Sequence, residues 1–189
     1  FPKNQPYTPA DFNPVGSYKH EFQIPSSWGM KEIFIHFGGV NSAFYLWVNG
    51  QMAGYHEDSK TPAEFNITPY VRPGNNQLAV EVYRWCDGSY LEDQDFWRLS
   101  GIERDVYLLA TPEVRIRDFF VRAGLKNNQE DGAFQLDVIL DNPQKKDLSS
   151  HTLAVRLLDE GRLLYEENSS PGKTSGSAVT ISFETMLKN

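Results

Sequence analysis

Apolar and polar residues alternate in short runs along the whole chain, and clusters of Asn, Pro, Gly and Ser separate these runs. Alternation with period two places successive side chains on opposite faces of a β-strand, and no long window repeats apolar residues at the spacing of an amphipathic helix. The chain is therefore predicted to be all-β. The expected strands cover residues 16–24, 43–48, 51–55, 77–83, 104–110, 114–121, 134–140, 153–158, 162–166 and 179–183.

The first expected strand, 16–24, carries its large apolar side chains on one face. Tyr18, Phe22 and Ile24 lie on this face, and the charged and amide side chains between them in the sequence point to the other face. In a strand with this pattern one face packs against a core and the other meets water. That apolar face is therefore predicted to be buried.

The run 43–48 is apolar on both faces and leads directly into Asn49-Gly50. This dipeptide tolerates positive φ at both positions, and it is the strongest short signal for a two-residue β-hairpin turn. Residues 51–55 are therefore expected to form the return strand. A second turn is expected at residues 73–76, before the strand at 77–83.

A change of pattern at Thr111-Pro112-Glu113 predicts a module boundary near residue 111. A chain of 189 residues suits two modules, because single domains cluster near about 100 to 150 residues. The strand spacing in 112–189 is typical of an immunoglobulin-like sandwich. Only about five strands are expected there, whereas such a sandwich has about seven, so its last strands are expected to be missing.

Charge and cysteine content exclude several classes of function. The net charge is −7 and no run is rich in Lys and Arg, so nucleic acid is not an expected partner.

No stretch reaches the roughly 18 to 20 apolar residues of a membrane span. The first residues do not resemble a signal peptide, so the chain is expected to start within a longer protein. Cys86 is the single cysteine; it is expected to be a small buried filler.

The segment between Tyr83 and Val106 concentrates acidic and aromatic residues. Its acids include Asp87, Glu92, Asp93 and Asp95, and its rings include Trp85, Tyr90, Phe96 and Trp97. One interpretation is a loop stiffened by aromatic packing and by ion pairs with Arg84, Arg98 and Arg104. The other is a binding loop, since carboxylates accept hydrogen bonds from sugar hydroxyls, aromatic rings stack on sugar C–H faces, and carboxylate oxygens suit hard cations.

A catalytic pair of carboxylates is not predicted within this segment. Retaining glycosidases hold two carboxyl groups about 5 Å apart, and inverting enzymes hold them about 6.5 to 9.5 Å apart. Neighbouring acids on an extended loop do not ensure either separation. From composition alone, the segment is a sugar-binding or cation-binding loop.

The same segment carries a resemblance to a known family. The run from Asp87 to Ile102, DGSYLEDQDFWRLSGI, resembles the signature of the large bacterial β-galactosidases of glycoside hydrolase family 2. The similarity continues through residues 13–18, 39–50 and 54–65, and it extends over about 7–121. It implies a galactose-binding-domain-like jelly-roll at 1–111, with its first strands missing, followed by a truncated immunoglobulin-like sandwich at 112–189.

The resemblance also implies a division of chemical roles. In that family a central TIM barrel, of which this chain would contain none, supplies both catalytic glutamates, so no catalytic residue is expected here. Asp95 matches a residue that reaches the barrel's active site, contacts galactose and helps to hold a sodium ion. The other sodium ligands and the magnesium ligands are expected in the barrel, and the intact enzyme is expected to be a homo-oligomer.

The main functional prediction is therefore a non-catalytic part of a retaining β-galactosidase that lends Asp95 to the active site. An alternative from another class is a freestanding carbohydrate-binding module with a sugar or calcium site in the acidic loop. A third is a purely structural pair of sandwiches. The expected truncation of the second sandwich argues against both alternatives.

Overall fold

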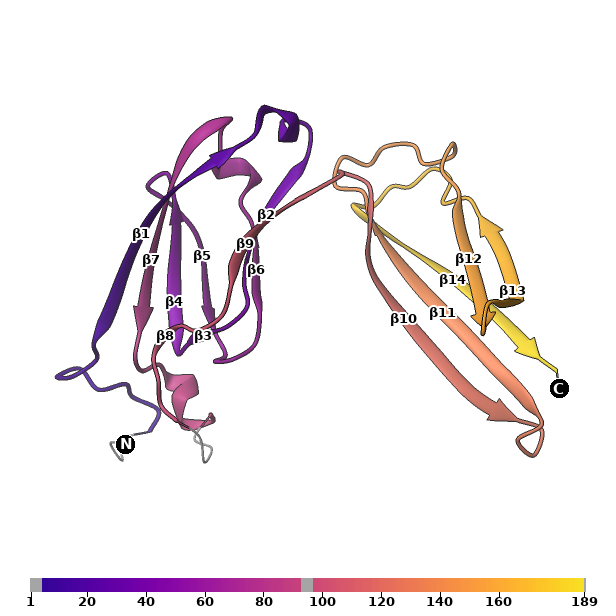
Figure 1. Ribbon diagram of the computed structural model, residues 1–189, viewed down its shortest axis with the longest axis horizontal. Helices are drawn as coiled ribbons and strands as arrows, with labels where there is room; N and C mark the ends of the chain where they lie inside the picture. The colour runs from indigo at the N-terminus through magenta and orange to yellow at the C-terminus, as the bar shows by residue number, and fades with distance from the viewer. Residues whose placement is uncertain (1–4, 93–96, 189) are drawn as a thin grey trace. The chain divides into compact units, whose positions relative to one another are not determined.

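The computed structural model describes residues 5–92 and 97–188. Strands make up the described chain apart from turns, loops and three short 3-10 helices, so the all-β prediction is confirmed (Figure 1). None of these helices is long enough to cross a membrane. Contacts divide the chain into two compact units, Phe1–Thr111 and Pro112–Asn189.

The first unit consists of two main sheets. The larger has the strand order β1-β7-β4-β5 and the smaller has the order β6-β2-β9, while the short strands β3 and β8 pair separately. The strands are β1 (Val15–Ile24), β2 (Glu32–Phe37), β3 (Val40–Asn41), β4 (Ala43–Val48), β5 (Gln51–Glu57), β6 (Ala63–Asn66), β7 (Gly74–Tyr83), β8 (Gly101–Ile102) and β9 (Val106–Thr111). The 3-10 helices are η1 (Ser26–Trp28), η2 (Thr68–Tyr70) and η3 (Asp87–Tyr90).

Large apolar side chains from both sheets fill the space between them. Phe37 on β2 and Phe44 on β4 are fully buried, and their ring centres lie 4.8 Å apart. Phe65 on β6 packs edge-on against Phe44 at 5.8 Å. The ring of Phe65 leaves no room for a side chain at Gly54 on β5, where a Cβ would lie 2.3 Å from its carbons. The first unit is therefore a β-sandwich with one continuous core.

The apolar face of β1 is not buried as predicted. Ile24 is buried and Phe22 packs partly against the core, but Tyr18 is 43% exposed. The cause is position, because among the described strands β1 pairs only with β7 and forms an edge of its sheet. The core reaches only the end of β1 that carries Phe22 and Ile24.

The predicted hairpin at Asn49-Gly50 is confirmed. Both residues have positive φ, 52° and 79°, and Val48 pairs with Gln51 across the turn. Positive φ at both central positions defines the type I′ turn, whose twist matches that of the flanking strands. The hairpin joins β4 to β5 and so fixes the position at which β5 begins.

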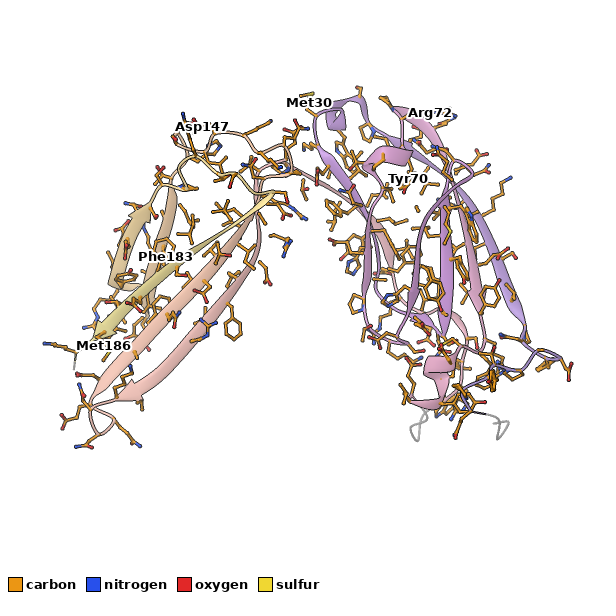
Figure 2. All side chains as sticks on the ribbon, turned by 180° about the vertical axis from the view of Figure 1, so that it is seen from behind. Met30, Tyr70, Arg72, Asp147, Phe183 and Met186 are labelled. Atoms are coloured by element: carbon orange, nitrogen blue, oxygen red, sulfur yellow. The ribbon has the colours of Figure 1, made fainter. Side chains whose placement is uncertain are left out.

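Asn49, which is half-buried, also forms a polar pair with the buried Asn76. Its side-chain amide donates to the Tyr70 carbonyl and to Oδ1 of Asn76, both at 2.8 Å, and its Oδ1 accepts from the Gln77 N–H at 3.0 Å. Asn76 is only 3% exposed, and it donates to the Arg72 carbonyl at 2.7 Å. These bonds hold the ends of β4 and β7 to the last residue of η2, Tyr70, and to the segment that follows it, which includes Arg72; both residues are labelled in Figure 2.

The second unit contains five strands within the described residues. One sheet has the order β10-β11-β14, and β12 and β13 form a separate hairpin. Val138, Phe183 and Val155 are buried together, so that the hairpin packs on the sheet (Figure 2). The strands are β10 (Arg115–Lys126), β11 (Asp131–Asp141), β12 (Leu153–Asp159), β13 (Arg162–Ser169) and β14 (Ala178–Leu187).

The core of the second unit leaves β10 largely uncovered. Phe119 and Val121 on β10 pair with Val138 and Leu136 on β11, so all four side chains lie on the core face of the sheet. Val138 is 3% exposed, whereas Phe119 is 64% and Val121 is 46% exposed. The hairpin therefore covers the face at β11 and β14 and not at β10. The number of strands expected beyond these five stays a prediction.

Candidate functional site

The acidic and aromatic segment lies at one end of the first unit (Figure 1). Its described residues border a cleft of about 510 Å³. The segment starts where β7 ends, forms η3 and later contributes β8, which pairs with β3. The cleft is also lined by the turn at 58–61 between β5 and β6, and by Asn41 and Ser42 at the junction of β3 and β4. These parts meet because β4 pairs with both β5 and β7.

Hydrogen bonds fix the start of the segment to residues near the N-terminal end of β1. The Asn13 side chain accepts from the Trp85 N–H at 2.9 Å and donates to the Trp85 carbonyl at 3.0 Å. The Arg84 N–H donates to the Pro14 carbonyl at 3.0 Å. The Arg84 guanidinium lies 5.1 Å from the centre of the Trp85 ring, a favourable cation–π arrangement. Trp85 is thereby held in the cleft wall.

Two charged side chains of the cleft, Glu92 and Arg104, bind backbone groups. Oε1 of Glu92 accepts a hydrogen bond from the Ser59 N–H at 2.7 Å. Nη1 of Arg104 donates to the carbonyls of Gly38, at 3.2 Å, and Lys60, at 2.9 Å. One interpretation of the sequence made Arg104 a candidate partner for an acid of its own segment; within the described residues its guanidinium binds these neutral carbonyls. Arg104 lies just before β9 and lines the cleft beside the turn that carries Lys60.

Only part of the predicted acidic cluster can be placed. Asp87 is exposed at the start of η3, and its Oδ1 accepts from the Gly88 N–H at 3.1 Å. Glu92 lines the cleft. Asp93 and Asp95 lie outside the described residues. The role expected of Asp95 in galactose and sodium binding is therefore not tested by the structure.

A second group of acidic residues forms where β5 approaches η3. Ligand atoms of Glu57, Cys86 and Asp87 all lie within 4.8 Å of one another, and Oε2 of Glu57 is buried without a hydrogen bond from the described residues. The two carboxylates suit a hard cation. Burial raises the pKa of the Cys86 thiol, so this group stays protonated at neutral pH and is a poor ligand.

Sequence reasoning identified the segment that forms one wall of the cleft but not the residues that meet it. Glu57 and Ser59 lie about thirty positions before that segment and carry no motif of their own. They reach it only through the pairing of β5 with β4. Cys86 was expected to be a buried filler, and it is indeed 6% exposed.

Comparison with known sequences gives one family and several relatives. Residues 2–112 match the family described as glycosyl hydrolases family 2, sugar binding domain. The chain is 48% identical over 187 residues to a β-galactosidase of Priestia megaterium, covering 97% of this chain and 18% of that protein. It is 52% identical over 120 residues to a β-galactosidase of Clostridium acetobutylicum, covering 64% of this chain and 13% of that protein. The chain thus spans less than a fifth of the length of these relatives.

Solved structures show the same fold at low sequence identity. A β-glucuronidase of Bacteroides uniformis superposes with a TM-score of 0.79 at 23% identity, covering 94% of this chain and 22% of that one. A protein described as a β-galactosidase of Bacteroides fragilis gives a TM-score of 0.77 at 21% identity, covering 94% of this chain and 28% of that one. Both likenesses cover strands of the first and the second unit.

Proposed function

Because this chain belongs to glycosyl hydrolase family 2, we propose that it is a non-catalytic part of a β-galactosidase that hydrolyses terminal, non-reducing β-D-galactosides with retention of configuration. The observation that carries the proposal is the 48% identity to a β-galactosidase over 97% of the chain. The family membership confirms the resemblance seen in the sequence. The remaining polypeptide, which the relatives possess, supplies the catalytic carboxylates in this proposal.

Asp95 is the residue through which this chain acts on the substrate in our proposal. A carboxylate brought in from a neighbouring domain accepts hydrogen bonds from galactose hydroxyls and neutralises a sodium ion, and so fixes the sugar for reaction. Support comes from the cleft beside the segment that carries Asp95. Its lining combines hydrogen-bonding groups, such as Asn41, with the rings of Trp85 and Trp97, the mixture that a sugar site needs.

Exposed apolar side chains near the cleft support docking of this segment onto the rest of the enzyme. Leu91 is 90% exposed, Trp97 is 77% exposed and Leu99 is 61% exposed. Large apolar groups gathered in one exposed segment mark an interaction surface. We propose that the catalytic barrel covers them and that its residues complete the sodium and magnesium sites.

The test is to compare this chain with the full-length enzyme. We expect the purified chain to show no hydrolysis of o-nitrophenyl β-D-galactoside, because the catalytic carboxylates lie elsewhere, and the full-length enzyme to hydrolyse it. Galactose titrated into the isolated chain should bind weakly or not at all, because most of its contacts are missing. Turnover that co-purifies with the chain through successive columns would contradict the division of roles. Tight sugar binding without activity in the full-length protein would favour a carbohydrate-binding module.

A further inference from the structure

The turn at residues 58–61 has a backbone conformation that residues other than glycine rarely adopt. The angle φ is 109° at Asp58 and 73° at Lys60. The Thr61 hydroxyl closes the turn by donating to the Asp58 carbonyl at 3.2 Å. All four residues of the turn line the cleft. A backbone of this kind persists only where its surroundings hold it in place, and such residues gather at functional sites.

Side chains from the segment between β7 and β9 hold this turn from outside. The Glu92 carboxylate accepts from the Ser59 N–H at 2.7 Å, between the two residues with positive φ. The Lys60 carbonyl accepts from Arg104 at 2.9 Å, and the Lys60 ammonium binds the Glu103 carboxylate. The shape of the turn therefore depends on residues of the acidic segment as well as on its own sequence.

Glu92 has a particular place among these contacts, because it joins the two walls of the cleft. Its own N–H donates to the Gly88 carbonyl in η3 at 3.1 Å, so its backbone is tied to one wall while its side chain holds the other. Glu92 also stands three positions before Asp95 in the sequence. A hydrogen bond from a backbone N–H to a charged carboxylate is among the stronger bonds available to a protein.

We infer that Glu92 is a positioning residue, whose carboxylate holds the turn at 58–61 in the shape that receives the galactoside. The identity of the ligand rests on the proposed function. Glu92 does not contact the reacting atoms in this scheme; it acts through Ser59. Without its carboxylate the turn keeps its contacts with Arg104 and Glu103 but loses the hydrogen bond at Ser59, so its positive-φ conformation is held less firmly and one wall of the cleft is less well placed. Substrate binding is then weakened, while the chemical step in the barrel is little affected.

The first part of the test uses this chain and measures hydrogen exchange of the Ser59 N–H by NMR. In Glu92→Ala we expect this exchange to be about tenfold faster or more, because the bond that protects the amide is lost. In Glu92→Gln we expect a change within about threefold, because the amide oxygen still accepts. Glu130→Ala, at an exposed position between β10 and β11, is the matched control. An unchanged Ser59 rate in Glu92→Ala would overturn the inference.

The second part measures kinetics of the full-length enzyme with o-nitrophenyl β-D-galactoside. Glu92→Ala should raise KM about three- to tenfold with kcat within about twofold, and Glu92→Gln should restore KM. A normal KM in Glu92→Ala would show that the turn does not position the ligand. If Glu92→Ala does not fold, Glu92→Asp, whose shorter side chain withdraws the carboxylate from the Ser59 N–H, takes its place with the same expected directions and the same overturning results. A raised KM with a normally protected Ser59 would show that the charge acts on the ligand directly, contrary to the inference.

Failure of the proposed function gives a different result. A wild-type full-length enzyme without β-galactosidase activity contradicts the proposed function and the ligand named here. The Ser59 exchange rates test the contact itself, whatever the ligand is.

Discussion

At the scale of single residues, the proposed function can be tested directly by replacing one carboxylate, that of Asp95. In the full-length enzyme, Asp95→Asn keeps the size of the side chain and removes its charge. We expect a lower kcat/KM, by roughly ten- to a hundredfold, and a weaker response to sodium, because a neutral amide binds both a cation and hydroxyl donors less well. The measurement is steady-state kinetics across a sodium titration.

The control for this substitution is Asp159→Asn. The Asp159 side chain is 62% exposed in the second unit and lies 3.9 Å from Arg162. This variant should behave as the wild type at every sodium concentration. Kinetics of Asp95→Asn that match the control throughout the titration would refute the assignment of Asp95 to the sodium site.

Individual residues of the site could be predicted from the sequence only where they lie in one dense segment. The clustering of acids and rings marked Glu92 and Trp85, and the structure places both in the cleft wall. The partner of Glu92, the Ser59 N–H, is a backbone group 33 positions away. A backbone donor leaves no trace in residue identity, so no pattern in the sequence could have marked it.

At the scale of secondary structure elements, Asp137 joins the three strands of the second unit's sheet. Its carboxylate, on β11, accepts from the Ser182 hydroxyl on β14 at 2.6 Å and from Arg122 on β10 at 2.5 Å. The hydrogen bond from Ser182 is the largest cause of a lowered pKa at Asp137, and the hydrogen bond from Arg122 is the second largest. The charged carboxylate therefore favours the folded sheet.

The sign of the resulting pH dependence follows from the lowered pKa. The stabilisation is present above the pKa of Asp137 in the unfolded chain and is lost as pH falls through the lower pKa of the folded state. We expect Asp137→Asn to lower the urea midpoint of the second unit at pH 7, and the difference from wild type to shrink below about pH 4. Urea unfolding followed by far-UV circular dichroism at several pH values measures this difference in midpoint, and Asp159→Asn is the control. A difference that persists unchanged to pH 2 would show that the charge is not the cause.

The elements themselves were predictable where local pattern and tertiary position agree. The hairpin of β4 and β5 was found from Asn49-Gly50, since the turn type depends on those two residues alone. The burial of β1 was predicted wrongly for Tyr18, because alternation does not reveal that a strand forms an edge. The strand β2, with Ile33, Ile35 and Phe37 buried on one face, was not expected, although its alternation is visible in the sequence.

At the scale of the whole molecule, the two units have separate cores that share no residue. All four tryptophans lie within residues 1–111, so tryptophan fluorescence reports on the first unit. Phe183→Ala removes a side chain that is 2% exposed in the second unit. We expect it to cost about 3 to 5 kcal/mol of that unit's stability, through lost burial and the cavity left behind.

The measurement is urea unfolding followed by two signals in parallel. Circular dichroism should show the second unit of Phe183→Ala unfolding at lower urea, while the fluorescence transition keeps its wild-type midpoint. Phe44→Ala, which opens the first core, is the reciprocal variant and should move the fluorescence transition. An equal shift of both signals in Phe183→Ala would mean that the two units unfold as one.

The buried position of the only cysteine makes local opening of this molecule chemically measurable. Cys86 lies in the segment that borders the cleft, directly before η3, and a thiol-specific reagent can reach it only when that end of the sandwich separates from its neighbours. The labelling rate in dilute, unperturbed protein therefore reports how often the cleft wall detaches, with no competing thiol to correct for. If Cys86 is labelled more slowly in the full-length enzyme, the difference between the two labelling times measures how much the rest of the polypeptide protects this end of the sandwich.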